Sequence, residues 1–323
     1  MGNFIIRRIA GMIPVLILIS LASFSLLVLM PGCPFDHLRM ADPDMPPEQI
    51  ERIRAIHGYD QPFYLRYVRW LQALIVRGDL GFSRRYQIPV AELIGRNIPR
   101  TILLMGLSMG LAIIIAIPIG IFSATRQYSL LDHLGTGFAF FGFAVPNFWL
   151  GMLLMILFAV HLRWLPAAGM RSVGFELEGW ALIADRARFL ILPVITLATA
   201  MMAAWMRYMR SSMLEVLHQD YIRTARAKGL DERLIIYKHG LRNALMTMIT
   251  LIALAIPGLF SGAILTEAVF AFPGMGRAFW HALVARDTFP VIAIIMMLAT
   301  LTIVFNLIAD ILYAFADPRV RYD

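Results

Sequence analysis

Long apolar stretches are the dominant pattern in this chain, and shorter polar segments separate them. A helix needs roughly 20 apolar residues to cross the hydrocarbon core of a bilayer. The stretches that approach or exceed this length are residues 9–30, 101–125, 134–160, 189–206, 245–265 and 291–314. The pattern therefore predicts an all-α membrane protein with six transmembrane helices.

The first apolar stretch has an alternative interpretation as a secretory signal, because Arg7 and Arg8 precede it. However, it is longer than the roughly 7–15 apolar residues of a signal, and no small-x-small cleavage site follows it. We therefore expect residues 1–30 to form a retained transmembrane helix.

The composition also favours the bilayer. Hydrophobic residues make up 59% of the 323 residues and charged residues only 15%, whereas soluble domains carry about 25% charged residues. Cys33 is the only cysteine, which excludes an intrachain disulfide and a cysteine-based metal cluster. The formal net charge is +8, but the basic residues are sorted by membrane side, which argues against nucleic acid as the partner.

The placement of charge predicts the topology. Both lysines, Lys228 and Lys238, lie between the fourth and fifth apolar stretches, together with several arginines. The positive-inside rule assigns this segment to the cytoplasm, and counting the crossings then assigns both chain termini to the same side. Segment 31–98 falls outside, and it exceeds the length of about 60 residues beyond which charge no longer decides the side.

Two polar segments predict helices of their own. Segment 31–98 contains two apolar helical stripes, the second ending at Gly78, which predicts a small external helical insertion. Segment 207–244 predicts a cytoplasmic helical hairpin that turns at Gly229, with Asp231 as the N-cap of its second helix. The expected domains are the helix 1–30, the insertion 31–98, a five-helix core 99–315 that contains loop 207–244, and a cytoplasmic tail 316–323.

Several kinds of chemistry lack their motifs. The sequence has no G-x-x-x-x-G-K-[ST] loop to cradle ATP phosphates and no H-E-x-x-H pair to bind zinc, so we expect no enzyme activity, cofactor or metal on this chain. An ion-coupled transporter usually places ionisable residues inside its helices, and only Asp310 lies within one of the six stretches. The 20 methionines favour packing over a metal path, because the thioether side chain is soft and flexible.

Four groups of residues resemble a known family. They are Gly78-Asp79-Leu80-Gly81-Phe82-Ser83, Val145-Pro146-Asn147-Phe148-Trp149-Leu150-Gly151, the string YIRTARAKG at 221–229, and Glu267 followed by Phe272-Pro273-Gly274-Met275-Gly276. Over nearly its whole length the chain resembles the permeases of the dipeptide, oligopeptide and nickel class of ABC importers. It departs from the general importer motif at Arg223, where that motif begins with glutamate, and at Thr247, where the family usually has proline.

The resemblance implies three groups of functional residues. The group that couples to the ATPase is Tyr221, Arg223, Thr224, Ala225, Arg226, Ala227, Lys228 and Gly229. The pathway or gating group is Pro257, Gly258, Ser261 and Gly262. An external loop that faces the receptor contains Glu267, Pro273, Gly274 and Gly276.

The resemblance also implies a multi-pass protein of the inner membrane with several partners. They are a second homologous permease, two ATP-binding subunits that hold ATP and Mg, and an external substrate-binding protein. Peptides are the broadest expectation for the cargo, with nickel, glutathione-like peptides and other small solutes left open. Two alternatives stay open as well: an ion-coupled transporter that needs no ATPase, and a non-transporting membrane protein whose basic loop docks a partner.

Overall fold

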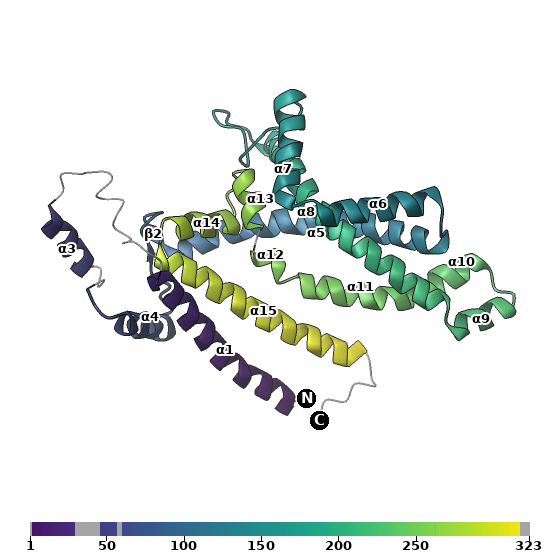
Figure 1. Cartoon of the computed structure of the whole chain (residues 1–323), viewed down its shortest axis with the longest axis horizontal. Coiled ribbons are helices and arrows are strands. Elements are labelled where there is room, and N and C mark those ends of the chain that lie inside the picture. The colour runs from purple at the N-terminus through teal and green to yellow at the C-terminus, as the bar shows by residue number, and fades with distance from the viewer. Residues whose placement is uncertain (1, 30–45, 57–59, 262, 317–323) are drawn as a thin grey trace. The chain divides into compact units, whose positions relative to one another are not determined.

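The computed structural model describes residues 2–29, 46–56, 60–261 and 263–316. Within these residues the chain is mostly helical, and its one sheet is a short two-stranded hairpin (Figure 1). The chain divides into two compact units, one comprising Met1–Pro99 and Ala278–Asp323 and the other Arg100–Arg277. Both termini of the chain thus belong to the same unit.

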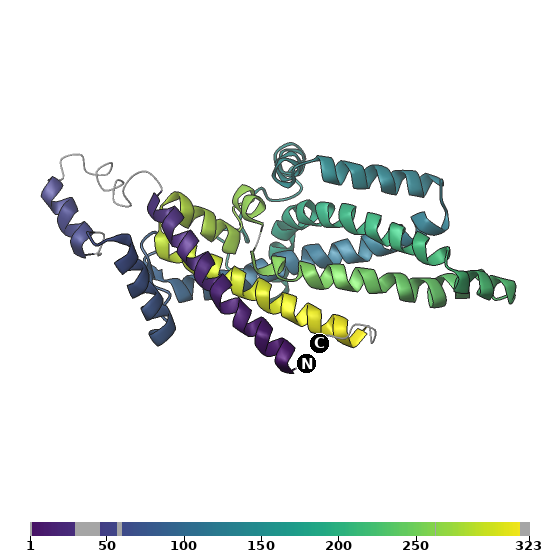
Figure 2. The ribbon, with the colours of Figure 1, turned by 60° about the horizontal axis from the view of Figure 1, so that its bottom comes forward.

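In the first unit, α1 (Gly2–Leu29) and α15 (Thr288–Ala316) lie side by side (Figures 1 and 2). Helix α4 (Phe63–Arg77) packs its buried face on them, because its aromatic stripe recurs at helical spacing. Tyr67 and Trp70 of α4 form one apolar cluster with Phe24 of α1 and Ile292 of α15. Helix α3 (Pro47–Ile56) precedes α4.

A β-hairpin in the same unit joins β1 (Phe82–Ser83) to β2 (Ile88–Pro89) in antiparallel register. The hairpin was not predicted from the sequence, because strands of two residues are too short to show an alternating pattern. Gln87, just before the second strand, has a φ of 55°, in the left-handed region that turns use. Helix α5 (Val90–Thr125) begins directly after the hairpin.

In the second unit, α5, α8 (Gly179–Leu217) and α11 (Leu241–Ala255) surround one apolar core (Figure 2). Methionines fill much of this core, and Met209, Met213 and Met248 are fully buried in it. Their contacts are with apolar side chains, as expected for flexible thioethers that fill irregular gaps.

The third apolar stretch forms two helices rather than one straight span. Helix α6 (Leu130–Ala144) and the segment Asn147–His161, made of α7 (Asn147–Met155) and η1 (Ile156–His161), are bent by 102° at the break between them. Pro146 explains the bend, because the ring of a proline forces the preceding residue out of the helical region. Val145 accordingly adopts an extended conformation, with φ −94° and ψ 121°.

Four helices among the described residues are long and apolar enough to cross a membrane, and the bent pair would make five. They are Val90–Thr125, Gly179–Leu217, Glu232–Phe260 and Thr288–Ile308. The apolar part of the first helix, Ala10–Leu26, is shorter. The mostly helical, multi-span architecture is therefore confirmed, whereas the count of six transmembrane helices stays a prediction.

Candidate functional site

The segment predicted to couple to an ATPase forms a compact helical hairpin at one end of α8 and α11 (Figure 1). Helix α9 (Asp220–Ala227) is its first arm, and α10 (Glu232–Leu234) with η2 (Ile235–Gly240) is its second. Asp231 is the N-cap residue of the second arm, as predicted, although its side chain makes no capping hydrogen bond. The flanking helices reach further into segment 207–244 than expected, because α8 continues to Leu217.

A small core holds the two arms of the hairpin together. Ile222 and Ala225 of α9 pack against Ile235 of η2, and all three are buried. The other members of the predicted coupling group are exposed, namely Tyr221, Arg223, Thr224, Arg226, Ala227, Lys228 and Gly229. The hairpin thus presents one outward face of mostly polar side chains on an apolar base.

Polar bonds close the hairpin at both ends. The Arg226 guanidinium forms two bonds to the Glu232 carboxylate, with Nη2–Oε1 at 2.6 Å and Nε–Oε2 at 3.2 Å. The pair is about half exposed, so we expect it to orient the arms more than to stabilise them. At the other end, Asn243 Nδ2 donates to the hydroxyl of Tyr221 at 2.8 Å.

The turn between the two arms requires glycine at position 229. Gly229 has a φ of +74°, a conformation that a Cβ makes costly. Its N–H donates to the carbonyl of Arg226 at 2.9 Å and so closes the last turn of α9. No atom lies within 4 Å of the position that a Cβ would take there. The need for glycine therefore comes from the backbone conformation and not from a steric clash.

The base of the hairpin is bonded to the core of the unit. Ser212 Oγ in α8 donates to the Ala244 carbonyl at 3.3 Å and approaches the Thr247 hydroxyl at 3.2 Å, both in α11. Thr247, which departs from the family's usual proline, therefore supplies a side-chain bond between the two helices. Ser212 thus connects α8 to α11 at the base of the hairpin.

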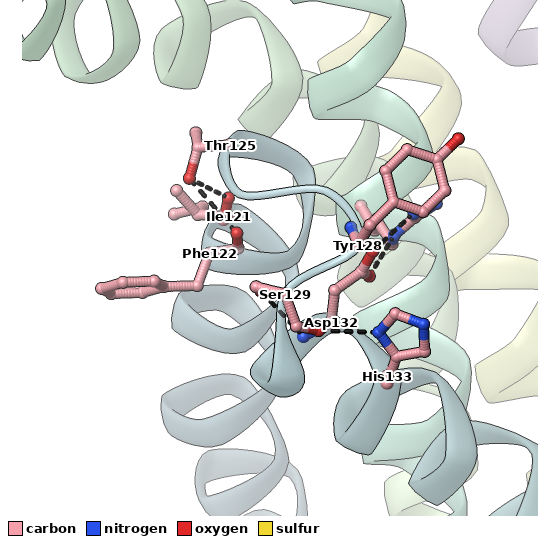
Figure 3. Close-up of polar contacts among 8 residues, drawn as sticks. Ile121, Phe122, Thr125, Tyr128, Ser129, Asp132 and His133 are labelled. Atoms are coloured by element: carbon pink, nitrogen blue, oxygen red, sulfur yellow. Dashed lines mark hydrogen bonds and ion pairs between the residues drawn. The ribbon is translucent and has the colours of Figure 1, made fainter.

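An ion pair near the same end was not predicted from sequence. Asp132 at the start of α6 accepts from Arg210 in α8, with Nε–Oδ1 at 2.8 Å and Nη2–Oδ2 at 3.1 Å. Figure 3 shows how the turn before α6 presents Asp132: the Tyr128 N–H donates to its carboxylate at 3.0 Å, and the Ser129 hydroxyl caps the helix. The local signal in the sequence was Ser129 followed three residues later by Asp132, the third residue of α6, a pattern typical of a helix start; it does not identify Arg210 as the partner.

The predicted pathway residues lie where α11 ends. Pro257 is buried and follows the last turn of α11, and Gly258 begins the short helix α12 (Gly258–Ser261). Ser261 closes that helix, and Gly262 lies outside the described residues. Helix α11 therefore stops at the Pro-Gly pair, as expected for a residue without a backbone N–H, while the gating role of these four residues stays a prediction.

The predicted external loop is organised around a buried carboxylate. Glu267 in α13 (Ile264–Val269) is fully buried, and it accepts from the Thr101 hydroxyl at 3.0 Å and from the Arg277 N–H at 3.0 Å. Burial raises the pKa of this carboxyl above its ordinary value, and the hydrogen bonds oppose the rise. A Cβ at Gly274 would lie 2.6 Å from the Glu267 Cδ, and one at Gly276 2.8 Å from the Ile264 Cα.

Glu267, Gly274 and Gly276 are thus brought together as the interior of the loop, and all three are buried. Pro273 is partly exposed, and its carbonyl accepts from Arg100 Nη1 at 3.4 Å. We conclude that the glycines of the Pro-Gly-Met-Gly sequence make room for the glutamate. Contact between this loop and a receptor stays a prediction.

The Gly-Asp-Leu-Gly-Phe-Ser segment has a structural role in the first unit. The Gly81 N–H donates to Asp79 Oδ1 at 2.8 Å, and a Cβ at Gly81 would lie 2.7 Å from the ring of Phe289. Ser83 Oγ then donates to Asp287 Oδ2 at 2.7 Å, and this aspartate is 1% exposed. The segment thereby attaches the chain before α5 to the start of α15.

Comparison with known proteins finds relatives of similar length that match over the whole chain. The chain is 44% identical over 323 residues to the oligopeptide transport system permease protein AppB of Bacillus subtilis (strain 168), covering 100% of both chains. It is 37% identical over 340 residues to the dipeptide transport system permease protein DppB of Escherichia coli (strain K12), covering 100% of this chain and 99% of that protein. A solved structure of the MetNI methionine ABC transporter in inward-facing conformations is more distant, with a TM-score of 0.49 and 16% identity over 69% of this chain and 95% of that chain.

Two family models match successive parts of the chain. Residues 1–105 match the N-terminal region of the binding-protein-dependent transport system membrane component. Residues 116–322 match the binding-protein-dependent transport system inner membrane component itself. The resemblance predicted from the motifs is confirmed, and the chain belongs to the family of binding-protein-dependent transport system inner membrane components.

Proposed function

We propose that this chain is a transmembrane permease subunit of an ATP-driven importer and forms half of the translocation pathway for peptides or a related small solute. Its family and its relatives, which are named as oligopeptide and dipeptide permeases, support this proposal. The second half of the pathway comes from a homologous permease, an external binding protein delivers the cargo, and two ATP-binding subunits supply the energy.

The outward face of the hairpin is the observation that carries the proposal. An element that receives force from another protein must present exposed groups on a stiff support. Tyr221, Arg223 and Lys228 are exposed, while Ile222 and Ala225 fix the same helix from within. We infer that this face docks on an ATP-binding subunit.

The proposed coupling runs from the hairpin into the membrane helices. The hairpin is continuous with α8 and α11, and Ser212 bonds the two helices to each other at its base. A shift of the docked hairpin would therefore move α8 and α11 together. Pro257 and Gly258, where α11 ends, would take up the change of angle near the pathway.

The proposal includes an orientation. The hairpin lies in the cytoplasm with both chain termini, while segment 31–98 and the loop that contains Glu267 lie outside. The excess of lysine and arginine in segment 207–244 supports this orientation.

Gly229→Val tests the docking role. A β-branched residue at φ +74° costs about 1–2 kcal/mol or distorts the turn. Gly174→Val is a matched control, because Gly174 is also exposed, has a φ of +88° and has no atom within 4 Å of its Cβ position. Both variants would be purified with the partner permease, the ATP-binding subunits and the binding protein.

We expect Gly229→Val to insert and pair with the second permease, but to recover less ATP-binding subunit and to lose uptake and receptor-stimulated ATP hydrolysis. Gly174→Val should recover the ATP-binding subunit at the wild-type level, which separates a docking defect from the general strain of a β-branched residue at positive φ. Wild-type recovery and hydrolysis in Gly229→Val would show that the basic hairpin only sets the orientation. Peptide uptake by the wild-type permeases without the ATP-binding subunits would instead favour an ion-coupled transporter.

A further inference from the structure

A cavity of about 670 Å³ in the unit Arg100–Arg277 has a strongly basic wall. Four arginines line it, namely Arg100, Arg171, Arg186 and Arg277, and the described lining residues include no aspartate or glutamate. The volume lies within the range of about 300–1,000 Å³ that is typical of small-molecule sites. Like charges that converge on one cavity repel each other, so the arrangement favours an anionic ligand.

Two of these arginines are attached to the same loop. Arg277 Nη1 donates to the Ala271 carbonyl at 2.6 Å, and Arg100 Nη1 donates to the Pro273 carbonyl at 3.4 Å. Both side chains are partly buried, which holds their positions and lowers the entropy cost of binding. Glu267, the acid of the same loop, is fully buried and does not line the cavity.

Gly169, which also lines the cavity, is bonded to this loop. The Gly169 N–H donates to the Phe270 carbonyl at 2.8 Å. Asp185, the sequence neighbour of Arg186, accepts from the Ser172 N–H at 2.8 Å and from the Ser172 hydroxyl at 2.7 Å. The carboxylate of Asp185 keeps its negative charge, but both of its oxygens accept from Ser172, and Asp185 is not among the residues that line the cavity.

We propose that this cavity binds a carboxylate group of the cargo as it enters the pathway. The inference rests on the proposed function, which supplies peptides as cargo and an external position for the cavity. Guanidinium groups match the planar geometry of a carboxylate and bind it through two parallel hydrogen bonds. The C-terminal carboxylate is common to linear peptides of any sequence, so the cavity would recognise cargo without selecting among side chains.

Two other sources of anionic groups are possible occupants, namely acidic side chains of the binding protein and headgroups of anionic lipids. A concave site of this volume favours a small ligand over a protein surface, because protein interfaces are larger and flatter. The experiment separates the three sources.

The test is residue-specific labelling of arginine by phenylglyoxal, followed by mass spectrometry, on the complete transporter in nanodiscs. Labelling of Arg171 and Arg186 is compared with that of Arg163, an exposed arginine outside the cavity. The probes are trialanine, trialanine amide and unliganded binding protein, each in neutral phosphatidylcholine and with added phosphatidylglycerol.

We expect trialanine to slow labelling of the two cavity arginines severalfold in neutral lipid, with no effect of the amide and no change at Arg163. Equal protection by both peptides, or by neither, would overturn the proposal. Protection by unliganded binding protein would assign the cavity to receptor docking, and protection by phosphatidylglycerol alone would assign it to lipid.

Uptake provides a second measurement. In proteoliposomes, the double variant Arg171→Gln/Arg186→Gln should lower the uptake ratio of free-acid to amidated peptide by about tenfold, the effect of losing a hydrogen bond to a charged group. Arg163→Gln should leave the ratio unchanged, and an unchanged ratio in the double variant would refute the inference. If the wild type transports no peptide but trialanine still protects both arginines, the proposed function fails while the carboxylate site stands.

Discussion

Replacing Gly274 by alanine tests whether the buried glutamate organises the external loop. The added Cβ would lie 2.6 Å from the Cδ of Glu267, closer than real Cβ atoms approach other atoms. The glutamate has little freedom to retreat, because it is fully buried and bonded to the Thr101 hydroxyl and to the Arg277 N–H. The alanine must therefore displace the carboxylate from at least one of its partners.

Two costs combine in this variant. Overpacking of a filled interior costs about 1–3 kcal/mol, and a lost hydrogen bond to a charged group costs about 1.5–3 kcal/mol. The two ranges sum to about 2.5–6 kcal/mol, and even a cost of about 3 kcal/mol is roughly a hundredfold change in the unfolding equilibrium. For soluble chains of about 150–250 residues, 1 kcal/mol lowers the unfolding midpoint by about 2–4 °C, so a shift of several degrees should be seen.

The assay is thermal unfolding of the purified permease pair, followed by the loss of its monodisperse size-exclusion peak. Gly95→Ala is the control, because Gly95 is an exposed position inside α5 with no atom within 4 Å of its Cβ position. Alanine there should be neutral or stabilise by up to about 1 kcal/mol. If Gly274→Ala unfolds at the same temperature as the control, the glycine is not needed for the glutamate and our account of the loop is wrong.

Three further predictions concern charged residues. Burial raises the pKa of Glu267, so the native state holds the proton of this carboxyl more tightly than the unfolded state does. The stability of the fold should therefore be greatest below the ordinary pKa of glutamate and fall as the pH rises through the raised pKa. Glu267→Gln should flatten this fall when unfolding midpoints are measured across a pH series. Asp132→Asn should lower the free energy of unfolding by about 1–3 kcal/mol, because Arg210 is left partly buried without its anion. A double-mutant cycle with Arg210→Gln should measure the coupling energy between the two side chains. In a Cys33→Ser background, Lys228→Cys should react with an impermeant thiol reagent only after cells are permeabilised, and labelling of intact cells would reverse the topology.

Local signals in the sequence predicted much of the fold. Helix α4 ends at Arg77, one residue before the glycine expected to stop it, and α5 ends at Thr125, where the second apolar stretch ends. The third apolar stretch was expected to be one span, and its bend at Pro146 was not foreseen; that the bent pair crosses the membrane as one span stays a prediction. A proline within an apolar run is tolerated in many membrane helices, so the sequence alone does not distinguish a kink from a bend of 102°.

The candidate site was predictable where its bonds are local. Ile222 and Ala225 are three residues apart, which identifies the inner face of α9 from spacing alone. The Asp132–Arg210 pair joins residues 78 positions apart, and Glu267 bonds to Thr101 across 166 positions. Pairings of this kind depend on which helices become neighbours, and no periodicity in a single sequence reports that.

The bond between Ser83 and Asp287 spans 204 positions of the chain, and this separation has a consequence for biogenesis. At a synthesis rate of about 5–20 residues per second, the ribosome needs roughly 10–40 s to extend the chain from one to the other. During that time Phe24, Tyr67 and Trp70 have no Ile292 to pack against. The aromatic face of α4 therefore stays incompletely packed until the last helix is released, and a nascent chain arrested before α15 should be cleaved by an external protease within residues 60–89 more readily than the complete chain.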